Sequence, residues 1–308
     1  MNDTIAVLLA TYNGEKYLKE QIDSILNQTY KDIKIYIGDD CSKDGTIGII
    51  RAYKDLYPDK IVYYQNEVNI GFIKNFEKLL QSCSEDYIAF SDQDDIWLSS
   101  KLEEQIRAIK KEEKNDLSIM THSDLIMIDE NEQILHKSFF KFKKYKLKPE
   151  KDLGHILGPC GVMGNTMMIN RALKEKVLPF PENIDFHDYY IAVMCELFGK
   201  RITIFTSLVY YRIHQNNTSN NKLNPLVFNN IPYKNTQKNI TLRAIRKNNK
   251  IKKDDLIKIN FLIRYIENNC SFFYYFNIIR YKLLKRSFIY NVLFFLKIIH
   301  YKLIKKNI

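Results

Sequence analysis

The sequence predicts an α/β fold, a mostly parallel sheet with helices on both faces, followed by a helical and basic C-terminal extension. Between the N-terminus and Glu130, short apolar runs alternate with stretches whose apolar residues recur at helical spacing. Repeated strand–helix units with short links form parallel sheets covered by helices. After Asn220 the chain becomes basic and aromatic, with helical patterns.

The predicted elements before Glu130 alternate regularly. The apolar runs predicted as strands are Ile5–Ala10, Ile33–Gly38, Ile61–Gln65, Tyr87–Ser91 and Leu117–Ile128. The helices predicted between them are Glu15–Asn27, Asp44–Tyr57, Gly71–Ser82 and Lys101–Lys114. In the first of these, Leu18, Ile22 and Ile25 fall on one face of the helix, which is the spacing that predicts burial of that face.

The alternation breaks after Asp129. Lys-rich residues 137–151 are expected to form an exposed connection, and Asn-rich residues 215–240 a linker. A Gly/Pro-rich turn at residues 158–161 precedes the remaining elements. They are a strand at Gly164–Ile169 and a helix at Arg171–Val177 that prolines end. A second helix follows at His187–Phe198 and a long strand at Arg201–Ile213.

Length and composition limit the class of protein. With 308 residues, 45% of them hydrophobic, the chain can form one large domain plus an extension. Its five cysteines are odd in number, scattered and never at CxxC spacing, which argues against a disulfide framework or a thiolate zinc site. The first apolar run is too short for a secretory leader. We therefore expect a reducing, cytoplasmic location.

The net charge of +11 is unevenly distributed along the chain. Residues 221–308 contain 19 Lys and Arg against three acids, a net charge of +16, whereas the chain before them sums to −5. In Ser271–Ile308, aromatic clusters alternate with basic residues, and the longest uncharged stretch after Arg286 has about ten residues, too few to span a bilayer. We expect this segment to bind an anionic membrane surface. A helical cap with a charged outer face is the alternative; no nucleic-acid motif is found.

Two aspartate clusters follow directly after predicted strands. Asp39-Asp40 follows the second strand, and Asp92-Gln93-Asp94-Asp95 follows the fourth. Ligands of open α/β sheets bind at the carboxyl ends of the strands. Carboxylates gathered there repel one another unless a cation or a donor-rich ligand shares them. A divalent metal holding a nucleotide diphosphate meets that requirement.

Several motifs, in their order and spacing, resemble family 2 glycosyltransferases. They are Ala10-Thr11-Tyr12-Asn13-Gly14-Glu15, Asp39-Asp40-Cys41-Ser42-Lys43-Asp44-Gly45-Thr46 and Ser91-Asp92-Gln93-Asp94-Asp95-Ile96-Trp97. Four more are similar to the bacterial rhamnosyltransferase branch: Asn69-Ile70-Gly71, Gly164-Asn165-Thr166, His187-Asp188-Tyr189-Tyr190 and Tyr211-Arg212-Ile213-His214. The resemblance covers residues 4–215. It implies a GT-A fold (a Rossmann-like sheet) and inverting transfer of a sugar from a nucleotide diphosphate donor.

The resemblance also implies roles for individual residues. The nucleotide-sugar donor would contact Ala10, Tyr12, Glu15, Asp39, Asn69, Gly71, Asp92 and Gln93. A divalent ion, Mn²⁺ or Mg²⁺, would be held by Asp94, Asp92 and His214 together with the donor phosphates. Asp188 would be the general base that takes the proton of the acceptor hydroxyl. The acceptor would lie against Gly164, Asn165, His187 and Asp95.

Each of these assignments has a structural alternative. Asn13-Gly14 alone makes a good turn, and Asn69 could cap the following helix rather than leave N–H groups free for a phosphate. Asp188 stands in a first helical turn, where the helix dipole favours any acid. A lone histidine such as His214 is more often structural, and Arg212 could clamp a phosphate or pair with a surface acid.

The branch implies dTDP-rhamnose as donor and a lipid-linked saccharide acceptor, in surface polysaccharide biosynthesis at the inner face of the cell membrane. A UDP-sugar donor (GlcNAc, Gal or Glc) is the alternative. A non-catalytic nucleotide-sugar-binding subunit is a different class of function, which the base and the acid cluster argue against. A nucleotidyltransferase would need a basic glycine-rich loop after the first strand, and Thr11–Glu15 is not one. The expected domains are residues 1–215 and 216–308.

Overall fold

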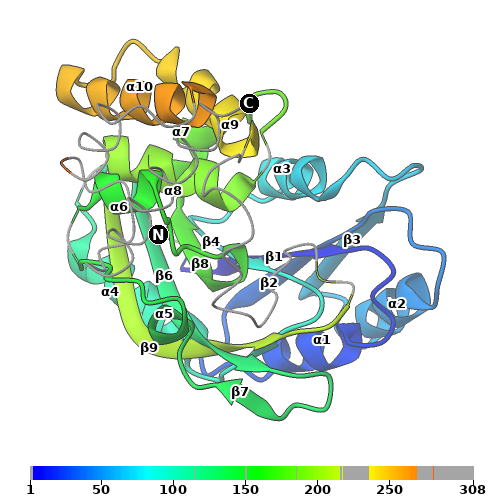
Figure 1. Ribbon diagram of the computed structural model, residues 1–308. Helices are drawn as coiled ribbons and strands as arrows, with labels where there is room; N and C mark the ends of the chain where they lie inside the picture. The colour runs from blue at the N-terminus through cyan, green and yellow to red at the C-terminus, as the bar shows by residue number, and fades with distance from the viewer. Residues whose placement is uncertain are drawn as a thin grey trace, which may run out of the picture.

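The computed structural model describes residues 3–114, 116–149, 151–184, 186–215, 217, 236–268 and 280. Within them, nine strands form one sheet in the order β3-β2-β1-β4-β8-β6-β9-β5, with β7 beside β6. Figure 1 shows the sheet with helices on both sides and the long strand β9 curving along it. The predicted α/β class is confirmed.

The first part of the chain forms strand–helix units, as the alternation predicts. Its elements are β1 (Ile5–Thr11), α1 (Leu18–Leu26), β2 (Ile33–Asp39), α2 (Thr46–Leu56), β3 (Ile61–Gln65), α3 (Phe72–Ser82), β4 (Tyr87–Ser91), β5 (Ile96–Trp97) and α4 (Lys101–Glu112). Strands β1 to β4 pair in parallel, so their carboxyl ends meet at one edge of the sheet.

The second part of the chain completes the sheet and adds helices. Its elements are β6 (Ile119–Ile128), β7 (Ile134–His136), α5 (Phe139–Phe142), α6 (Leu153–Leu157), η1 (Gly164–Thr166), β8 (Met167–Asn170), α7 (Arg171–Val177), α8 (His187–Phe198), β9 (Lys200–Arg212), α9 (Thr236–Arg246) and α10 (Lys253–Asn268). Strand β8 is antiparallel to both β4 and β6, while β9 is parallel to β6 and antiparallel to β5. The sheet is therefore parallel on the β1–β4 side and mixed beyond it.

The core lies on both faces of the central strands. The leading residues of β1, Ile5 to Leu9, have no exposed surface, which is expected of a parallel strand covered on both faces. Helices α1 and α2 lie on one side of the β1–β3 part and α3 on the other (Figure 1). The apolar face predicted for α1 is buried, since Leu18, Ile22 and Ile25 have no exposed surface.

Two local predictions are wrong. Residues 137–151 do not form a fully exposed connection, because Ser138 caps α5 by accepting from the Lys141 N–H, and Phe139 and Phe140 are buried. The lysines suggested exposure, but the aromatic residues between them pack inward. The predicted strand Gly164–Ile169 begins as a 3₁₀ turn, in which the Thr166 N–H donates to the Met163 carbonyl at 3.0 Å. The short elements β5, β7 and α6 were not predicted.

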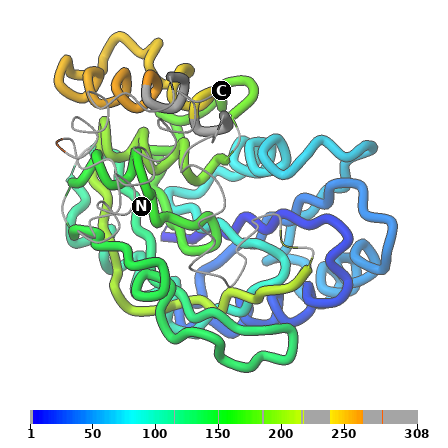
Figure 2. The backbone as a smooth tube through the Cα atoms, in the orientation of Figure 1, coloured from blue at the N-terminus to red at the C-terminus, as the bar shows by residue number. Residues whose placement is uncertain are grey.

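The described part of the C-terminal extension packs against the rest of the protein. Leu242 and Ile245 of α9 and Ile259 and Leu262 of α10 are buried, and α10 contacts α6. Figure 2 shows this yellow and orange segment beside the green part of the chain and away from the blue N-terminal strands. The aromatic and basic segment Ser271–Ile308 lies outside the described residues, except Arg280.

Two further features concern the described residues alone. None of their helices is long and apolar enough to cross a bilayer. The four described cysteines, Cys41, Cys83, Cys160 and Cys195, are free thiols, as their scattered positions predict; Cys270 lies outside the described residues.

Candidate active site

The loops after β1 and β4 are joined by one side chain. Gln93 accepts a hydrogen bond from the Tyr12 N–H at 2.8 Å and donates to the Tyr12 carbonyl at 3.0 Å. A Cβ atom on Gly14 would lie 2.2 Å from the Gln93 Oε1, so glycine is needed for this contact. The Tyr12 ring is 46% exposed and is accessible for stacking on a base. The role predicted for Gln93, donor binding, is thus accompanied by a structural one.

The loop after β1 is also tied to the loop after β2. Glu15 accepts from the Gly45 N–H at 2.6 Å, and Thr46 Oγ1 accepts from the Gly14 N–H at 2.8 Å. Ala10 lies beside Gly38 in the parallel ladder, near the end of both strands. The predicted donor residues of these two loops are therefore neighbours in space.

Asp39 is buried, and both of its carboxylate oxygens are occupied. One oxygen accepts from the Thr11 and Ser42 hydroxyls, and the other accepts from the Ser42 N–H at 2.9 Å and from Gln65 Nε2 at 3.1 Å. A carboxylate offers about four acceptor positions. In this arrangement Asp39 organises the loop after β2, and a contact with a nucleotide requires it to exchange one of these donors.

Asp40 binds the two N–H groups just before α3. Its carboxylate accepts from the Ile70 N–H at 2.9 Å and the Gly71 N–H at 2.8 Å, and Asn69 Oδ1 accepts from the same Gly71 N–H. The expectation that N–H groups at Asn69 to Gly71 are free for a phosphate is therefore wrong for Ile70 and Gly71. A carboxylate of the protein therefore binds the N–H groups of the turn that leads into α3, ahead of the first helical residue, Phe72.

Three segments distant in sequence meet beyond the end of β4. Asp95 Oδ2 accepts a hydrogen bond from Asn165 Nδ2, and the neighbouring Gly164 lies against α8, where a Cβ atom on it would come 3.2 Å from His187 Nε2 and 3.8 Å from the Asp188 Cβ. The loop after β4, the 3₁₀ turn η1 and the start of α8 are thus in direct contact.

Asp92, Asp94 and Asp188 form what we call the carboxylate cluster. Burial raises the pKa of Asp92 to about 7, and the negative charges of Asp94 and then Asp188 add to this effect. Like charges raise one another's pKa only when they lie near one another. The metal and base residues predicted from separate motifs therefore lie in one electrostatic neighbourhood.

Asp94 and His214 form a pair across the ends of two strands. His214 Nε2 lies 2.7 Å from Asp94 Oδ2, and both side chains are largely buried, with 10% and 16% of the His214 and Asp94 surfaces exposed. His214 lies just beyond the end of β9, so the predicted metal residues come from the loop after β4 and the end of β9. Arg212, two residues earlier, pairs with the half-exposed Glu20 at 2.6 Å, as the surface-acid alternative predicts, and its Nε donates to the Asp94 carbonyl at 3.2 Å.

The predicted acceptor residues Asp95 and Asn165 are buried, at 0% and 1% exposed surface. Burial, together with the charges of Asp94 and Asp92, raises the pKa of Asp95 well above its ordinary value. Its other oxygen accepts from the Arg212 N–H at 3.3 Å. Both residues are therefore covered by the protein in this arrangement, and the acceptor contacts predicted for them stay a prediction.

His187 is packed among aromatic rings. Its ring stacks on Phe76 at a centroid distance of 4.3 Å and lies 5.6 Å from Phe90, and neither ring nitrogen has a hydrogen-bond partner among the described residues. Burial lowers the pKa of His187 to about 3, so the ring is neutral. With 5% exposed surface, it forms part of the wall beside Asp188 rather than a polar acceptor contact.

A divalent cation fits the donor set only if the substrate supplies most of its ligands. Among the described residues, no three His, Cys, Asp or Glu side chains are placed to hold a metal by themselves. Asp94 and His214 are nevertheless 2.7 Å apart, beside Asp92. Carboxylate oxygen and imidazole nitrogen suit Mn²⁺, and Mg²⁺ is commonly bound by one or two carboxylates plus substrate phosphates.

A hollow of about 390 Å³ lies on the other side of Arg212, lined by Glu20, Asp23, Ser24, Asn27, Ile96, Trp97, Ser99 and Glu132. It contains none of the predicted catalytic or metal residues. The sequence-based reasoning also missed Glu20, Gln65 and Tyr17, which contact Arg212, Asp39 and His214. No sequence signal marks them, because each pairs with a residue far along the chain.

Comparison with known proteins agrees with this geometry. The family model described as glycosyl transferase family 2 matches residues 6–175. The chain is 29% identical over 228 residues to the UDP-Glc:alpha-D-GlcNAc-diphosphoundecaprenol beta-1,3-glucosyltransferase WfaP of Escherichia coli, covering 73% of this chain and 83% of that protein. It is 43% identical over 103 residues to the dTDP-rhamnosyl transferase RfbG of Shigella flexneri, covering 32% of this chain and 35% of that one.

Solved structures show the same fold. S. aureus TarS 1-349, in complex with UDP-GlcNAc, superposes with a TM-score of 0.59 at 19% identity, over 86% of this chain and 72% of that one. The mannosyltransferase PcManGT of Pyrobaculum calidifontis, in complex with GDP-Man and Mn²⁺, superposes with a TM-score of 0.57 at 13% identity, over 90% and 72%. These similarities confirm the GT-A fold. With the family match over more than half of the chain, they show that the protein belongs to family 2 of the glycosyltransferases, enzymes that transfer a sugar from a nucleotide-sugar donor.

Proposed function

We propose that this protein is an inverting, metal-dependent glycosyltransferase that moves rhamnose from dTDP-rhamnose to a lipid-linked saccharide, in surface polysaccharide biosynthesis. The observation that carries the proposal is the meeting of three segments: Asp94 with His214, Asp95 with Asn165, and Gly164 with the start of α8, next to Asp188. This meeting supports assigning leaving-group stabilisation and proton removal to residues at one edge of the sheet.

In this proposal Asp188 accepts the proton of the acceptor hydroxyl as that oxygen attacks the anomeric carbon. The bond from the anomeric carbon to the nucleotide diphosphate breaks on the opposite side, which inverts the configuration. A divalent ion bound by Asp94 and His214, with Asp92 nearby, would supply charge neutralisation at the diphosphate. Tyr12, at the end of β1, stacks on the nucleobase, and the neutral His187 ring keeps the wall beside Asp188 apolar.

The donor is the least constrained part of the proposal. The rhamnosyl choice rests on the motifs His187-Asp188 and Tyr211-Arg212-Ile213-His214 and on the similarity to RfbG, which is named a dTDP-rhamnosyl transferase. WfaP is named a UDP-glucose enzyme that acts on a diphosphoundecaprenol-linked sugar, which supports a UDP-sugar as the alternative donor and a lipid-linked acceptor in both cases.

A screen of nucleotide sugars tests the activity. Purified protein is incubated with dTDP-rhamnose, UDP-Glc, UDP-Gal and UDP-GlcNAc, each with Mn²⁺, with Mg²⁺ and with a chelator, and release of the nucleotide diphosphate is measured. We expect release from dTDP-rhamnose that depends on the metal and increases when a membrane extract supplies acceptor. Binding of a nucleotide sugar without any release under all conditions would instead favour the non-catalytic subunit.

Membrane association is a separate part of the proposal, with the inner face of the cell membrane as the location. Its support is the net charge of +16 on residues 221–308 and the aromatic clusters after Ser271. Flotation of the full chain with anionic liposomes, compared with a chain ending at residue 268, measures it. If the full chain and the chain ending at residue 268 float equally well, residues 269–308 do not bind the membrane and this part of the proposal is wrong.

A further inference from the structure

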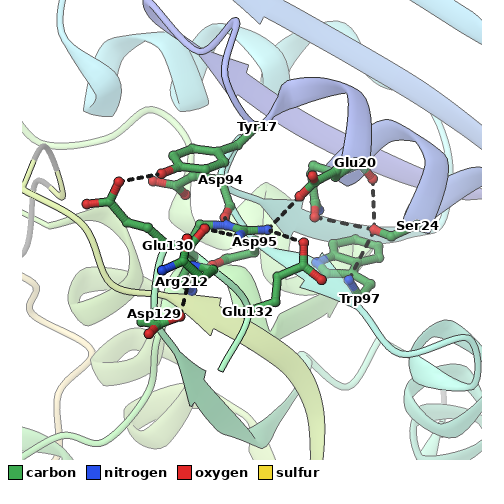
Figure 3. Close-up of polar contacts among 12 residues, drawn as sticks. Tyr17, Glu20, Ser24, Asp94, Asp95, Trp97, Asp129, Glu130, Glu132 and Arg212 are labelled. Carbon is green, nitrogen blue, oxygen red and sulfur yellow. Dashed lines mark hydrogen bonds and ion pairs between the residues drawn. The ribbon is translucent and has the colours of Figure 1, made fainter. Parts of the chain in front are cut away.

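Arg212, at the end of β9, is buried and makes contacts in several directions. Its side chain is 1% exposed, and its Nη2 lies 2.6 Å from Glu20 Oε2 of α1. Its Nε donates to the Asp94 carbonyl at 3.2 Å and its Nη1 to the Glu130 carbonyl at 3.4 Å. Figure 3 shows the guanidinium between Glu20 on one side and Asp94 and Glu130 on the other.

These contacts reach both members of the Asp94–His214 pair. The guanidinium holds the main chain of Asp94, while the Arg212 N–H donates to Asp95 Oδ1 at 3.3 Å. The guanidinium also lies over the Tyr17 ring at 4.6 Å, and the His214 ring lies against that same ring at a centroid distance of 5.2 Å. A single residue therefore fixes the backbone that carries Asp94 and the aromatic surface on which His214 rests.

We propose that Arg212, oriented by Glu20, is a positioning residue that keeps Asp94 and His214 in the geometry required to bind a divalent cation. The inference rests on the proposed metal dependence. Partners that orient metal ligands from behind typically change metal affinity by roughly 10–100-fold when they are replaced. The planar fork of arginine suits this role, because it donates in three directions from one rigid group, which lysine cannot do.

Glu20 provides the means to test the role without breaking the fold. Its side chain is 47% exposed, so replacing it removes little packing, whereas Arg212 is buried and its loss would disturb the core. Glu132, at 3.7 Å from Nη2, is too far to replace the Glu20 hydrogen bond without moving. In the Glu20→Gln variant the guanidinium keeps its carbonyl partners but loses the charged group that fixes its direction.

The experiment measures Mn²⁺ binding directly, from the loss of the free Mn²⁺ electron paramagnetic resonance signal, in excess dTDP and, separately, excess UDP. The variants are Glu20→Gln and Arg212→Lys, with thermal unfolding measured in parallel. The matched control is Glu104→Gln on α4, a glutamate 38% exposed and 2.6 Å from Arg107. We expect Glu20→Gln to weaken Mn²⁺ binding about tenfold and Arg212→Lys at least as much. The control should bind Mn²⁺ as the wild type does.

The outcomes separate this inference from the proposed function. If the wild type binds no Mn²⁺ with either nucleotide, the proposed metal dependence fails and this inference fails with it. If the wild type binds Mn²⁺ and Glu20→Gln binds it equally well, only the positioning role is overturned. If Arg212→Lys does not fold, Glu20→Gln alone decides. A loss of Mn²⁺ affinity that merely follows a lowered unfolding midpoint would also overturn it.

Discussion

The aspartates after β2 and those after β4 differ in what surrounds them. Asp39 and Asp40 face N–H and O–H donors from their own and neighbouring loops, with four hydrogen bonds to the first and three to the second. Asp92 and Asp94 instead lie near one another and near Asp188, with His214 Nε2 at 2.7 Å from Asp94 Oδ2, and burial with the charges of Asp94 and Asp188 raises the pKa of Asp92 to about 7. The sequence patterns of the two clusters are similar, but the first is surrounded by hydrogen-bond donors and the second by other negative charges.

We infer from this difference that Asp39 and Asp40 stabilise their loops, whereas Asp92 and Asp94 are the carboxylates expected to bind a ligand. A carboxylate whose acceptor positions are filled by the protein is stable without any partner. Acidic groups held close together are unfavourable until a proton or a cation is shared among them. The β4 side of the edge is therefore where we expect catalysis and metal binding to be most sensitive to substitution.

Replacing Asp188 with asparagine should give the largest effect. The amide cannot accept the acceptor's proton, so the transfer rate should fall by roughly 10²–10⁴-fold. Binding of the nucleotide, measured by calorimetry, should be nearly unchanged. Asp254→Asn, the same substitution in the first turn of α10, is the control and should leave transfer unchanged. Transfer at the wild-type rate in Asp188→Asn would remove the base from the mechanism.

Asp39→Asn should destabilise the fold more than Asp94→Asn. An amide NH₂ in place of one Asp39 oxygen would face donors, with an expected loss of roughly 2–4 kcal/mol in the free energy of unfolding. Asp94→Asn removes one of several neighbouring negative charges together with the carboxylate that pairs with His214, so we expect a smaller loss of stability than for Asp39→Asn, while Mn²⁺ binding is lost. Denaturant unfolding of both variants measures the difference. Equal destabilisation by the two substitutions would contradict the inference that the aspartates after β2 matter more for stability than those after β4.

His187→Phe should make the protein more resistant to acid. Because burial lowers the pKa of His187 to about 3, the folded state binds fewer protons than the unfolded state below pH 6.5, and stability is lost as the pH falls. Between pH 6.5 and pH 5 this amounts to about 2 kcal/mol. Phenylalanine keeps the aromatic packing and has no proton to bind. The loss of unfolding free energy between pH 7 and pH 5 should be about 2 kcal/mol smaller in the variant than in the wild type; an unchanged difference would contradict the prediction.

Gly14→Ala should have the smallest effect. It tests the contact between the loop after β1 and the loop after β4, which Gln93 makes. The new Cβ would collide with Gln93 Oε1, which can move at the cost of its bonds to Tyr12, so we expect a loss of about 1 kcal/mol. In a Gln93→Ala background the same substitution should cost less, because the colliding group is gone. Thermal unfolding of the four proteins of this cycle gives the coupling. Additive losses would mean that Gln93 does not link the loops.

The strands and helices before Glu130 were predicted well from the sequence, because their periodicities are regular and their links short. The aspartates at the ends of β2 and β4 were found for the same reason. What could not be predicted is which carboxylate has which partner. Asp40 binds the N–H groups just before α3, and Arg212 pairs with Glu20 across 192 positions, through contacts that depend on the three-dimensional path of the chain. The buried aromatic surroundings of His187 were hidden in the same way.

Two successive segments of the chain contribute the two parts of the candidate site. The loops predicted to bind the nucleotide all come from residues before β5, while Gly164, Asp188 and His214 come from the later segment that adds β8, α8 and β9. Polar side-chain contacts between the two halves at this edge include Asp94 with His214 and Asp95 with Asn165. A chimaera that exchanges residues 153–214 with a relative would thus replace one wall of the site as a unit, provided that the junction pairs are retained.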